Sequence, residues 1–161
     1  MNIAVGLSGG VDSAVTFALL KEQGHIVQGI TMKIWSDGRY QGGSADACFG
    51  PHEAHDIRAA AALCKQLSVP YHVFDCAQAY EAIVLEYFRR EYLEGRTPNP
   101  CIRCNSLMKF GVLLDMARTS GVKFDAFATG HYARVARENN RWGVRKGVDL
   151  LKDQSYFLYR L

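Results

Sequence analysis

The chain lacks any apolar run close to the roughly 20 residues that a membrane-spanning helix requires. Its N-terminus also lacks the basic region and the cleavage site of a signal peptide. The 161 residues are 48% hydrophobic and 22% charged, which is ordinary for a soluble globular protein. We therefore expect a cytosolic chain of one domain's length with no membrane partner.

A disulfide framework is lacking too. Five cysteines are an odd number, and disulfides are rare in the cytosol. Cys64 falls on the apolar face of a predicted helix and Cys76 follows a predicted strand, so we expect both thiols in the core. The others are Cys48, Cys101 and Cys104.

The glycine turn near the N-terminus has no lysine after it. Residues 8–13 read Ser-Gly-Gly-Val-Asp-Ser, between an apolar run and a stretch of helical period. This excludes the lysine-bearing P-loop, and the glycines do not have the dinucleotide G-x-G-x-x-G spacing. Strand, turn and helix nevertheless present backbone N–H groups and a positive helix end to an anion. We interpret the segment as a phosphate site to which Ser8 and Ser13 can add hydroxyl donors.

Asp12 is unexpected in a simple anion site, because a carboxylate repels phosphate unless a cation lies between them. The residue therefore predicts a bound Mg²⁺. The alternative is that Asp12 or Ser13 merely caps the helix while the glycines turn the chain.

Strand and helix patterns alternate along the chain. We expect strands at residues 3–7, 25–33, 71–75 and 124–129, and helices at residues 51–66, 78–93 (ended by Gly95) and 105–120. Such alternation predicts an α/β fold, a doubly wound parallel sheet with ligands at the carboxyl ends of its strands. Residues 133–146 fit a small β-hairpin turning at Asn139-Asn140.

Two further stretches and the charge leave alternatives open. Residues 34–50 form a long polar connection, interpreted either as an active-site loop or as disorder without function. The apolar end, residues 155–161, needs a covering surface, from downstream domains or a partner, and we favour a truncated chain.

The charge is unevenly distributed along the chain. Residues 1–80 carry a net charge of −2 and residues 81–161 one of +5, which allows a nucleic-acid partner or a merely solvated face.

The second chemical signal is Cys101-Ile102-Arg103-Cys104, which follows two prolines and precedes a predicted helix. Such a pair can be a redox couple, two metal ligands, or a nucleophile with a neighbour. The helix N-terminus and Arg103 would favour the thiolate of Cys104. A half zinc site is the competing interpretation, with Cys48, His52, His55 or His131 as further ligands.

The segment Ser8–Ser13 resembles the PP-loop of the ATP pyrophosphatases, an adenine nucleotide alpha hydrolase-like fold. Further motifs resemble the tRNA-specific 2-thiouridylase family (MnmA type) from Ala4 to Leu161. These motifs are residues 32–35 (MKIW), 95–100 (GRTPNP) with 104–105 (CN), 109–111 (KFG), 128–134 (ATGHYAR) and 152–158 (KDQSYFL).

The resemblance implies that ATP adenylates the 2-carbonyl oxygen of the wobble uridine of tRNA, and that a persulfide sulfur then displaces AMP. It places Cys104 as the nucleophile. ATP would be held, with Mg²⁺, by Gly6, Leu7, Ser8, Gly9, Gly10, Val11, Asp12, Ser13, Met32 and Gly130. The target base would face Asn99, Pro100 and Cys101, and tRNA would contact Lys152, Asp153 and Gln154.

Two departures from the family limit this transfer. Some members have an aspartate, a candidate general base, where this chain has Cys101; the C-x-x-C form instead suggests a [4Fe–4S] cluster held by Cys101, Cys104 and a third cysteine. The family's persulfide-carrying cysteine and its central and C-terminal domains lie beyond Leu161. We therefore expect one ATP-binding and thiolation domain over residues 1–161, with the tRNA contacts in residues 95–161, that binds ATP but thiolates poorly alone.

The resemblance also implies a persulfide donor protein as the source of the sulfur. A cysteine nucleophile suits the reaction, since a thiolate is the side chain best able to attack near neutral pH. His131 could contact ATP or substrate, or be a structural histidine. Trp35 and Tyr40 could stack on a base or be partly buried. Two other functions stay open: a PP-loop ligase or sulfur-insertion enzyme acting on a small molecule, and a non-catalytic ATP- or cluster-binding module.

Overall fold

The computed structural model describes residues 1–35 and 52–161. These residues form two compact units. Unit 1 comprises Met1–Ala77 and Leu113–Gly130, and unit 2 comprises Gln78–Val112 and His131–Leu161. The predicted single domain over residues 1–161 therefore stays a prediction. Tyr40, Cys48 and most of the connection at residues 34–50 lie outside the described residues.

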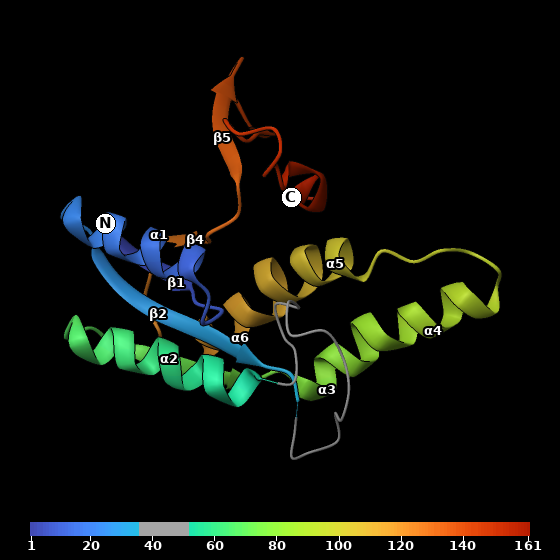
Figure 1. The fold of residues 1–161 in the computed structure, drawn as a ribbon, viewed down its shortest axis with the longest axis horizontal. Coiled ribbons are helices and arrows are strands. Elements are labelled where there is room, and N and C mark those ends of the chain that lie inside the picture. Colours follow the sequence, from blue (N-terminus) through green and yellow to red (C-terminus); the bar gives the residue numbers. More distant parts are fainter. Residues whose placement is uncertain (36–51) are drawn as a thin grey trace. The chain divides into compact units, whose positions relative to one another are not determined.

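Unit 1 is built on a parallel sheet with the strand order β3-β2-β1-β4 (Figure 1). The strands are β1 (Asn2–Gly6), β2 (Ile26–Lys33), β3 (Tyr71–Asp75) and β4 (Ala126–Ala128). Their bounds agree with the predicted strands within a few residues. The central strand β1 is apolar on both faces, as a strand covered from both sides must be.

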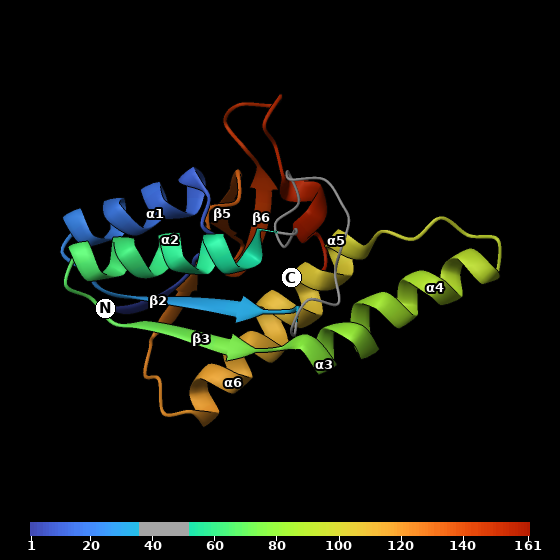
Figure 2. The same ribbon diagram turned by 60° about the horizontal axis from the view of Figure 1, so that its bottom comes forward.

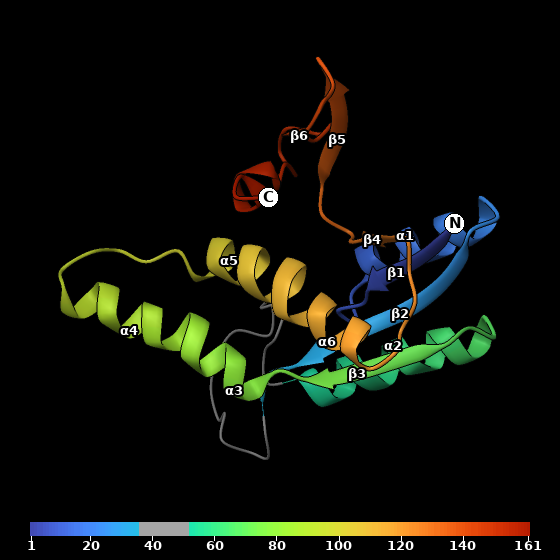
Figure 3. The same ribbon diagram turned by 180° about the vertical axis from the view of Figure 1, so that it is seen from behind.

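Helices lie on both faces of this sheet. Figures 2 and 3 show α1 (Val11–Glu22) and α2 (Glu53–Gln66) on one face and α6 (Leu113–Thr119) on the other. The α/β fold with a doubly wound parallel sheet is thereby confirmed. The core between β1, β2, α1 and α2 consists of Ile3, Val5, Leu7, Phe17, Val27, Ala60 and Cys64.

Unit 2 contains most of the remaining helices. A continuous helical run comprises α3 (Ala77–Tyr80), the π-helix η1 (Glu81–Leu85) and α4 (Glu86–Leu93). It ends where expected, because Gly95 has a φ of +73°. The second run comprises α5 (Pro100–Arg103) and the π-helix η2 (Cys104–Val112), and α6 follows.

The predicted start of this second helix near Asn105 was wrong, because the helix begins at Pro100. The side-chain oxygen of Asn99 accepts the N–H of Ile102 at 3.2 Å, which caps the first turn. Proline is well suited to the first helical position, since its missing N–H has no helical partner there. Asn99-Pro100 is therefore a start signal that the sequence already contained.

The hairpin predicted at residues 133–146 is confirmed. It consists of β5 (Ala133–Glu138) and β6 (Arg141–Lys146), paired antiparallel. Asn139 and Asn140 have φ angles of +46° and +64°, as a two-residue hairpin turn requires. A single 3-10 turn, η3 (Ser155–Leu158), follows.

The expectations on core thiols and membrane helices also agree with the structure. Cys64 and Cys76 are each 1% exposed. None of the described helices combines the length and the apolar character needed to cross a bilayer. At the chain's end Leu158 is buried, whereas Tyr156 and Tyr159 are exposed.

We predict that Gly29→Ala destabilises unit 1 by about 1–3 kcal/mol, because overpacking a tight core forces its neighbours apart. A Cβ there would lie 2.7 Å from Cδ1 of Leu7 and 2.8 Å from Sγ of Cys64. The matched control is Gly143→Ala, also in a strand, whose Cβ would meet nothing within 4 Å. Urea unfolding measures both, and equal midpoints for the two variants would contradict the packing argument.

Candidate functional site

The bend between β1 and α1 is held by hydrogen bonds of its own residues. The hydroxyl of Ser13 donates to the carbonyl of Gly10 at 2.9 Å and accepts the N–H of Ser8 at 3.3 Å. The two serine hydroxyl oxygens lie 3.3 Å apart. Ser13 is buried, so its hydroxyl shapes the bend from inside.

Backbone from two other segments of unit 1 lies directly against this bend. Gly9 has a φ of +80°, and a Cβ on it would lie 2.5 Å from Cβ of Asp56 in α2. A Cβ on Gly130, which follows β4, would lie 2.8 Å from the backbone nitrogen of Ser13 and from the backbone carbon of Asp12. Only glycine allows approaches this close. The structure thus brings together the residues at 8–13 and Gly130.

The first turn of α1 is not capped by a side chain. The N-cap residue is Gly10, which has no side chain, so the capping role of Asp12 or Ser13 stays an alternative. The N–H groups at the positive end of a 12-residue helix that begins after a glycine are suited to bind an anion. Asp12 and Val11 in this turn are exposed.

The other residues expected at ATP are more deeply placed. Leu7 and Met32 are 4% and 1% exposed. A Cβ on Gly6 would lie 3.0 Å from Cζ of Phe127. The carbonyl of Leu7 accepts the hydroxyl of Thr31 at 2.7 Å. These residues fix the sheet edge behind the bend, and Met32 takes part in the core.

Sequence reasoning missed Glu53, the first residue of α2. Its carboxylate oxygens accept the N–H groups of Ile34 at 2.7 Å and Trp35 at 3.2 Å, beyond the end of β2. Burial raises the pKa of this carboxyl above its usual value, and the two backbone N–H groups oppose that shift. Its signal was an acidic residue at a predicted helix start.

Cys101 and Cys104 lie one turn apart at the start of the second helical run of unit 2. Cys101 is exposed in the first turn of α5, whereas Cys104 is 9% exposed at the start of η2. Since the helix begins earlier than predicted, its N-terminus lies beside Cys101 rather than Cys104. π-helical segments often occur at functional sites.

Arg103 is engaged with other residues of unit 2. Its Nε donates to the carbonyl of Ile83 at 2.6 Å, and its guanidinium carbon lies 4.6 Å from the ring centroid of Tyr87. Arg103 thereby holds α5 to the first helical run. The expectation that it favours the thiolate of Cys104 stays a prediction.

Asn105, which the sequence analysis named only as part of the motif at residues 104–105 and without a role, connects η2 to η3. Its Nδ2 donates to the carbonyl of Phe157 at 3.1 Å, which also fixes the orientation of the amide, because a carbonyl can only accept. Its Oδ1 is buried without a hydrogen-bond partner among the described residues. A buried acceptor without a hydrogen-bond partner destabilises the folded state. The link between the helix that carries Cys104 and this turn therefore has a cost in folding free energy.

The three residues expected to contact tRNA occupy the turn before η3. Lys152 is exposed. Asp153 accepts the N–H of Gly147 at 2.7 Å and the hydroxyl of Ser155 at 2.8 Å, and these bonds lower the pKa of its carboxyl. Gln154 accepts the N–H of Tyr132 at 3.0 Å. Asp153 and Gln154 therefore also shape the turn itself.

His131 is half-buried and belongs to unit 2. Burial, and second the positive charge of Lys109, lower the pKa of its imidazole to about 4. The ring is consequently neutral at physiological pH, so it can exchange hydrogen bonds but cannot supply a positive charge to phosphate.

The residues described here do not complete a metal centre. Within residues 1–35 and 52–161 no three His, Cys, Asp or Glu side chains are grouped to bind an ion. The pair Cys101 and Cys104 could supply two ligands of a [4Fe–4S] cluster, fewer than a cluster requires. The cluster and the zinc alternative therefore remain predictions.

A parallel sheet with a glycine bend between its first strand and first helix is the arrangement typical of nucleotide-binding α/β proteins. The chain belongs to the family described as "tRNA methyl transferase HUP domain", which it matches over residues 1–161. The resemblance drawn from the motifs is also confirmed, since curated relatives named tRNA-specific 2-thiouridylase MnmA match the whole chain.

Three of these relatives show the extent of the similarity. The protein from Endomicrobium trichonymphae is 50% identical over 100% of this chain and 46% of its own length. Those from Geotalea uraniireducens and Chloroflexus aurantiacus are 45% and 47% identical, over 99% of this chain and 42% and 43% of their lengths. The chain thus spans less than half the length of these relatives.

Two solved structures are also similar. One is described as a predicted subunit of tRNA methyltransferase from Methanocaldococcus jannaschii, with a TM-score of 0.48 and 16% identity over 88% of this chain and 55% of that one. NMN synthetase from Francisella tularensis has a TM-score of 0.45 and 21% identity over 73% and 41%. Neither likeness carries weight for the function.

We predict that the folded chain loses stability as the pH falls from about 6.5 towards 4 because of His131. In that window the unfolded chain binds a proton at this imidazole and the folded chain does not. His131→Gln should reduce the loss by on the order of 2 kcal/mol in urea unfolding at several pH values. The control is His55→Gln, whose side chain is 73% exposed. A parallel pH profile for His131→Gln and the parent would contradict the assignment.

A second prediction concerns thiol reactivity. Burial raises the pKa of Cys64 and of Cys76 to about 11, so their thiolate fraction at pH 7.5 is about 3 in 10,000. Iodoacetamide should modify the exposed Cys101 first and Cys104 more slowly, with Cys64 and Cys76 protected, as peptide mass spectrometry can measure. In denaturant the four should react alike. Labelling of Cys76 as fast as Cys101 in the folded chain would rule this order out.

Proposed function

We propose that this chain is the ATP-binding and adenylation part of a tRNA 2-thiouridylase. The observation that carries the proposal is the backbone-built bend before α1, whose N-cap is Gly10. Its Gly9 packs against Asp56 of α2, and Gly130 packs against its Asp12 and Ser13. The names of the relatives, tRNA-specific 2-thiouridylase MnmA, support tRNA as the substrate. The cytosolic compartment and a persulfide donor protein are parts of the same proposal.

In this reaction the N–H groups of the α1 turn and the hydroxyl of Ser8 bind phosphate oxygens of ATP. Asp12, exposed in that turn, would hold a Mg²⁺ that neutralises the phosphates. The 2-carbonyl oxygen of the uridine attacks the α-phosphorus and pyrophosphate leaves. Adenylation converts a poor leaving oxygen into a good one, so sulfur can then replace it with release of AMP.

The cysteines have separate roles in the proposal. Cys104 is the nucleophilic thiol, held in η2 by the link between Asn105 and Phe157. Cys101, exposed in the first turn of α5 with Asn99 and Pro100, faces the target base. The sulfur comes from a persulfide carried on a second cysteine. Its terminal sulfur displaces AMP from the adenylated carbon, and the thiolate of Cys104 then attacks the inner sulfur, which frees the 2-thiouridine and leaves a disulfide between the two cysteines.

The test uses a glycine pair within the bend. A Cβ on Gly10 would lie 3.5 Å from Oγ of Ser8, an ordinary contact, so Gly10→Ala should keep the parent's unfolding midpoint. It should nevertheless weaken ATP binding at least tenfold, because the methyl group occupies the phosphate seat. Gly9→Ala should lower the unfolding midpoint itself. Calorimetric titration with Mg-ATP and urea unfolding measure the two effects.

Asp12→Asn should reduce the Mg²⁺ dependence of ATP binding, while Cys104→Ser should bind ATP like the parent. Pyrophosphate release should require an unmodified tRNA transcript. Release driven instead by a small acceptor would favour the ligase interpretation, and no release with tRNA and the sulfur donor both present would favour a non-catalytic module. Full ATP affinity in Gly10→Ala would overturn the assigned seat.

A further inference from the structure

The hairpin β5–β6 in unit 2 concentrates the positive charge of the chain. Residues 133–146 hold five Lys or Arg residues against the single acid Glu138, a balance of +4. The other 147 residues hold fourteen against fifteen, a balance of −1. The net charge of the chain is thus set by this hairpin, and a local surplus of this kind marks a surface for a polyanion.

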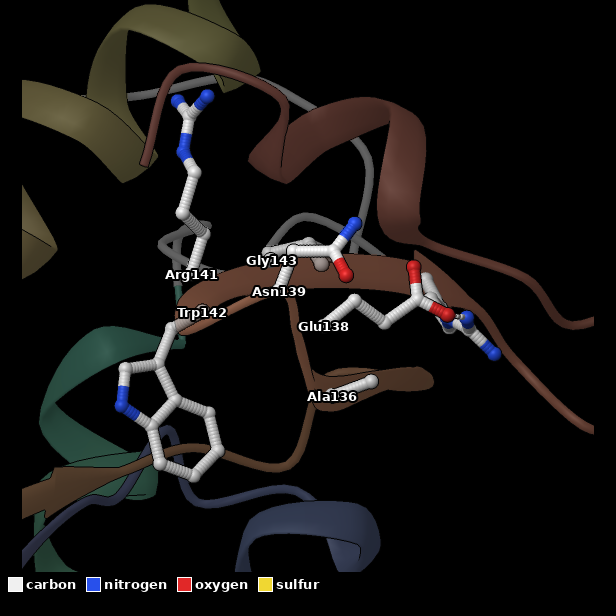
Figure 4. Close-up of a pocket in the computed structure, with 8 residues that line it drawn as sticks. Ala136, Glu138, Asn139, Arg141, Trp142 and Gly143 are labelled. Carbon is white, nitrogen blue, oxygen red and sulfur yellow. Dashed lines mark ion pairs between the residues drawn. The ribbon is translucent and has the colours of Figure 1, made fainter.

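Strand pairing divides the hairpin into two faces, since side chains alternate along each strand. Arg137 is paired with Trp142 and Val135 with Val144 on the first face, called here the tryptophan face. The other face is called here the arginine face. On it Arg134 lies opposite Arg145, Ala136 opposite Gly143 and Glu138 opposite Arg141. In Figure 4 the side chains of Trp142 and Arg141 leave the ribbon in different directions.

The tryptophan face presents an exposed aromatic ring beside a cation. Trp142 is 69% exposed, and the guanidinium carbon of Arg137 lies 5.7 Å from its ring centroid. Arg137 also donates to Oδ1 of Asn140 at 3.0 Å, which steadies it. An open indole with a neighbouring guanidinium suits an unpaired base and its phosphate, because stacking and cation–π contacts act together.

The arginine face is hollowed. A hollow of about 300 Å³ lies beside the small residues Ala136 and Gly143 (Figure 4). The other residues that line it are Glu138, Asn139, Arg141, Trp142, Val144 and Arg145. The carboxylate of Glu138 forms an ion pair with the guanidinium of Arg145. Among the residues that the structure describes, Arg141 has no ion pair, so its guanidinium can bind an external anion.

We propose that the hairpin β5–β6 is an RNA-binding ribbon on which Trp142 stacks against an unpaired base while Arg137 and Arg141 contact phosphates. The identity of that RNA as tRNA rests on the proposed function. RNA fits better than a protein surface because cations surround the exposed apolar side chains. Burying those cations against a protein would cost desolvation free energy, whereas RNA phosphates neutralise them.

The stacking contact is tested with two substitutions at one position. Trp142→Ala should weaken binding of an unmodified tRNA transcript about 5- to 150-fold, the range for losing one stacked base, whereas Trp142→Phe should keep most of the affinity. Binding should quench tryptophan fluorescence in the parent, and Trp142→Phe should lose that quenching. A stem-loop RNA should bind better than a blunt duplex of equal length, because only its loop offers an unpaired base.

The phosphate contacts are tested by salt dependence. Arg141→Ala and Arg137→Ala should each reduce the slope of log affinity against log salt by about 1, uniformly across RNA sequences. The matched control is Arg89→Ala, which removes one exposed arginine from α4, outside the hairpin. Circular dichroism melts establish that the variants fold.

The outcomes separate this inference from the proposed function. If the chain binds tRNA and the hairpin variants bind it equally well, the inference is overturned and the function stands. If the variants lose RNA binding but tRNA never stimulates pyrophosphate release, the inference stands and the function is wrong. Unchanged RNA binding together with altered self-association of Trp142→Ala would assign the tryptophan face to a protein contact and overturn the RNA-binding ribbon.

Discussion

The close approach of three backbone segments at the β1–α1 bend is the constraint on which the anion seat depends. A single Cβ on Gly9 or Gly130 would enter the space of Asp56, Asp12 or Ser13 at 2.5–2.9 Å. In the proposed seat, peptide groups held by the sheet and by α2 would keep their N–H donors oriented before a ligand binds. Such preorganised dipoles stabilise an anion without a reorganisation cost. An anion site built from side-chain donors would be held less rigidly than one built from peptide groups.

Unit 2 is organised by side chains that bond to backbone. Asp153 and Gln154 hold the turn before η3, and Asn105 connects η3 to the helix that carries Cys104. The residues expected to meet tRNA therefore also determine the shape of the surface that would meet it. A substitution at Asp153 would change both the turn and any RNA contact, so loss of function there would not by itself identify an RNA ligand. The exposed side chains of Lys152 and Trp142 give cleaner evidence.

Much of this was predictable because the signals are local. Periods of two and 3.6 residues located the strands and helices, and Asn139-Asn140 located the hairpin turn. The helix start at Pro100 was not predicted, although Asn99-Pro100 is also a local signal. The partners of Glu53 and Asn105 could not be found in this way, since Ile34 and Phe157 lie 19 and 52 positions away in the sequence.

The sequence by itself determined the order of the elements, the glycine bend and the thiol pair, because propensity, periodicity and turn chemistry act over a few residues. It also determined that the charge is concentrated in the hairpin. Only the tertiary structure decided which glycines are indispensable for packing, that α1 is left uncapped, and that Met32 is 1% exposed. These features arise where segments far apart in the sequence meet, and such contacts depend on the packing of the whole sheet rather than on neighbouring residues.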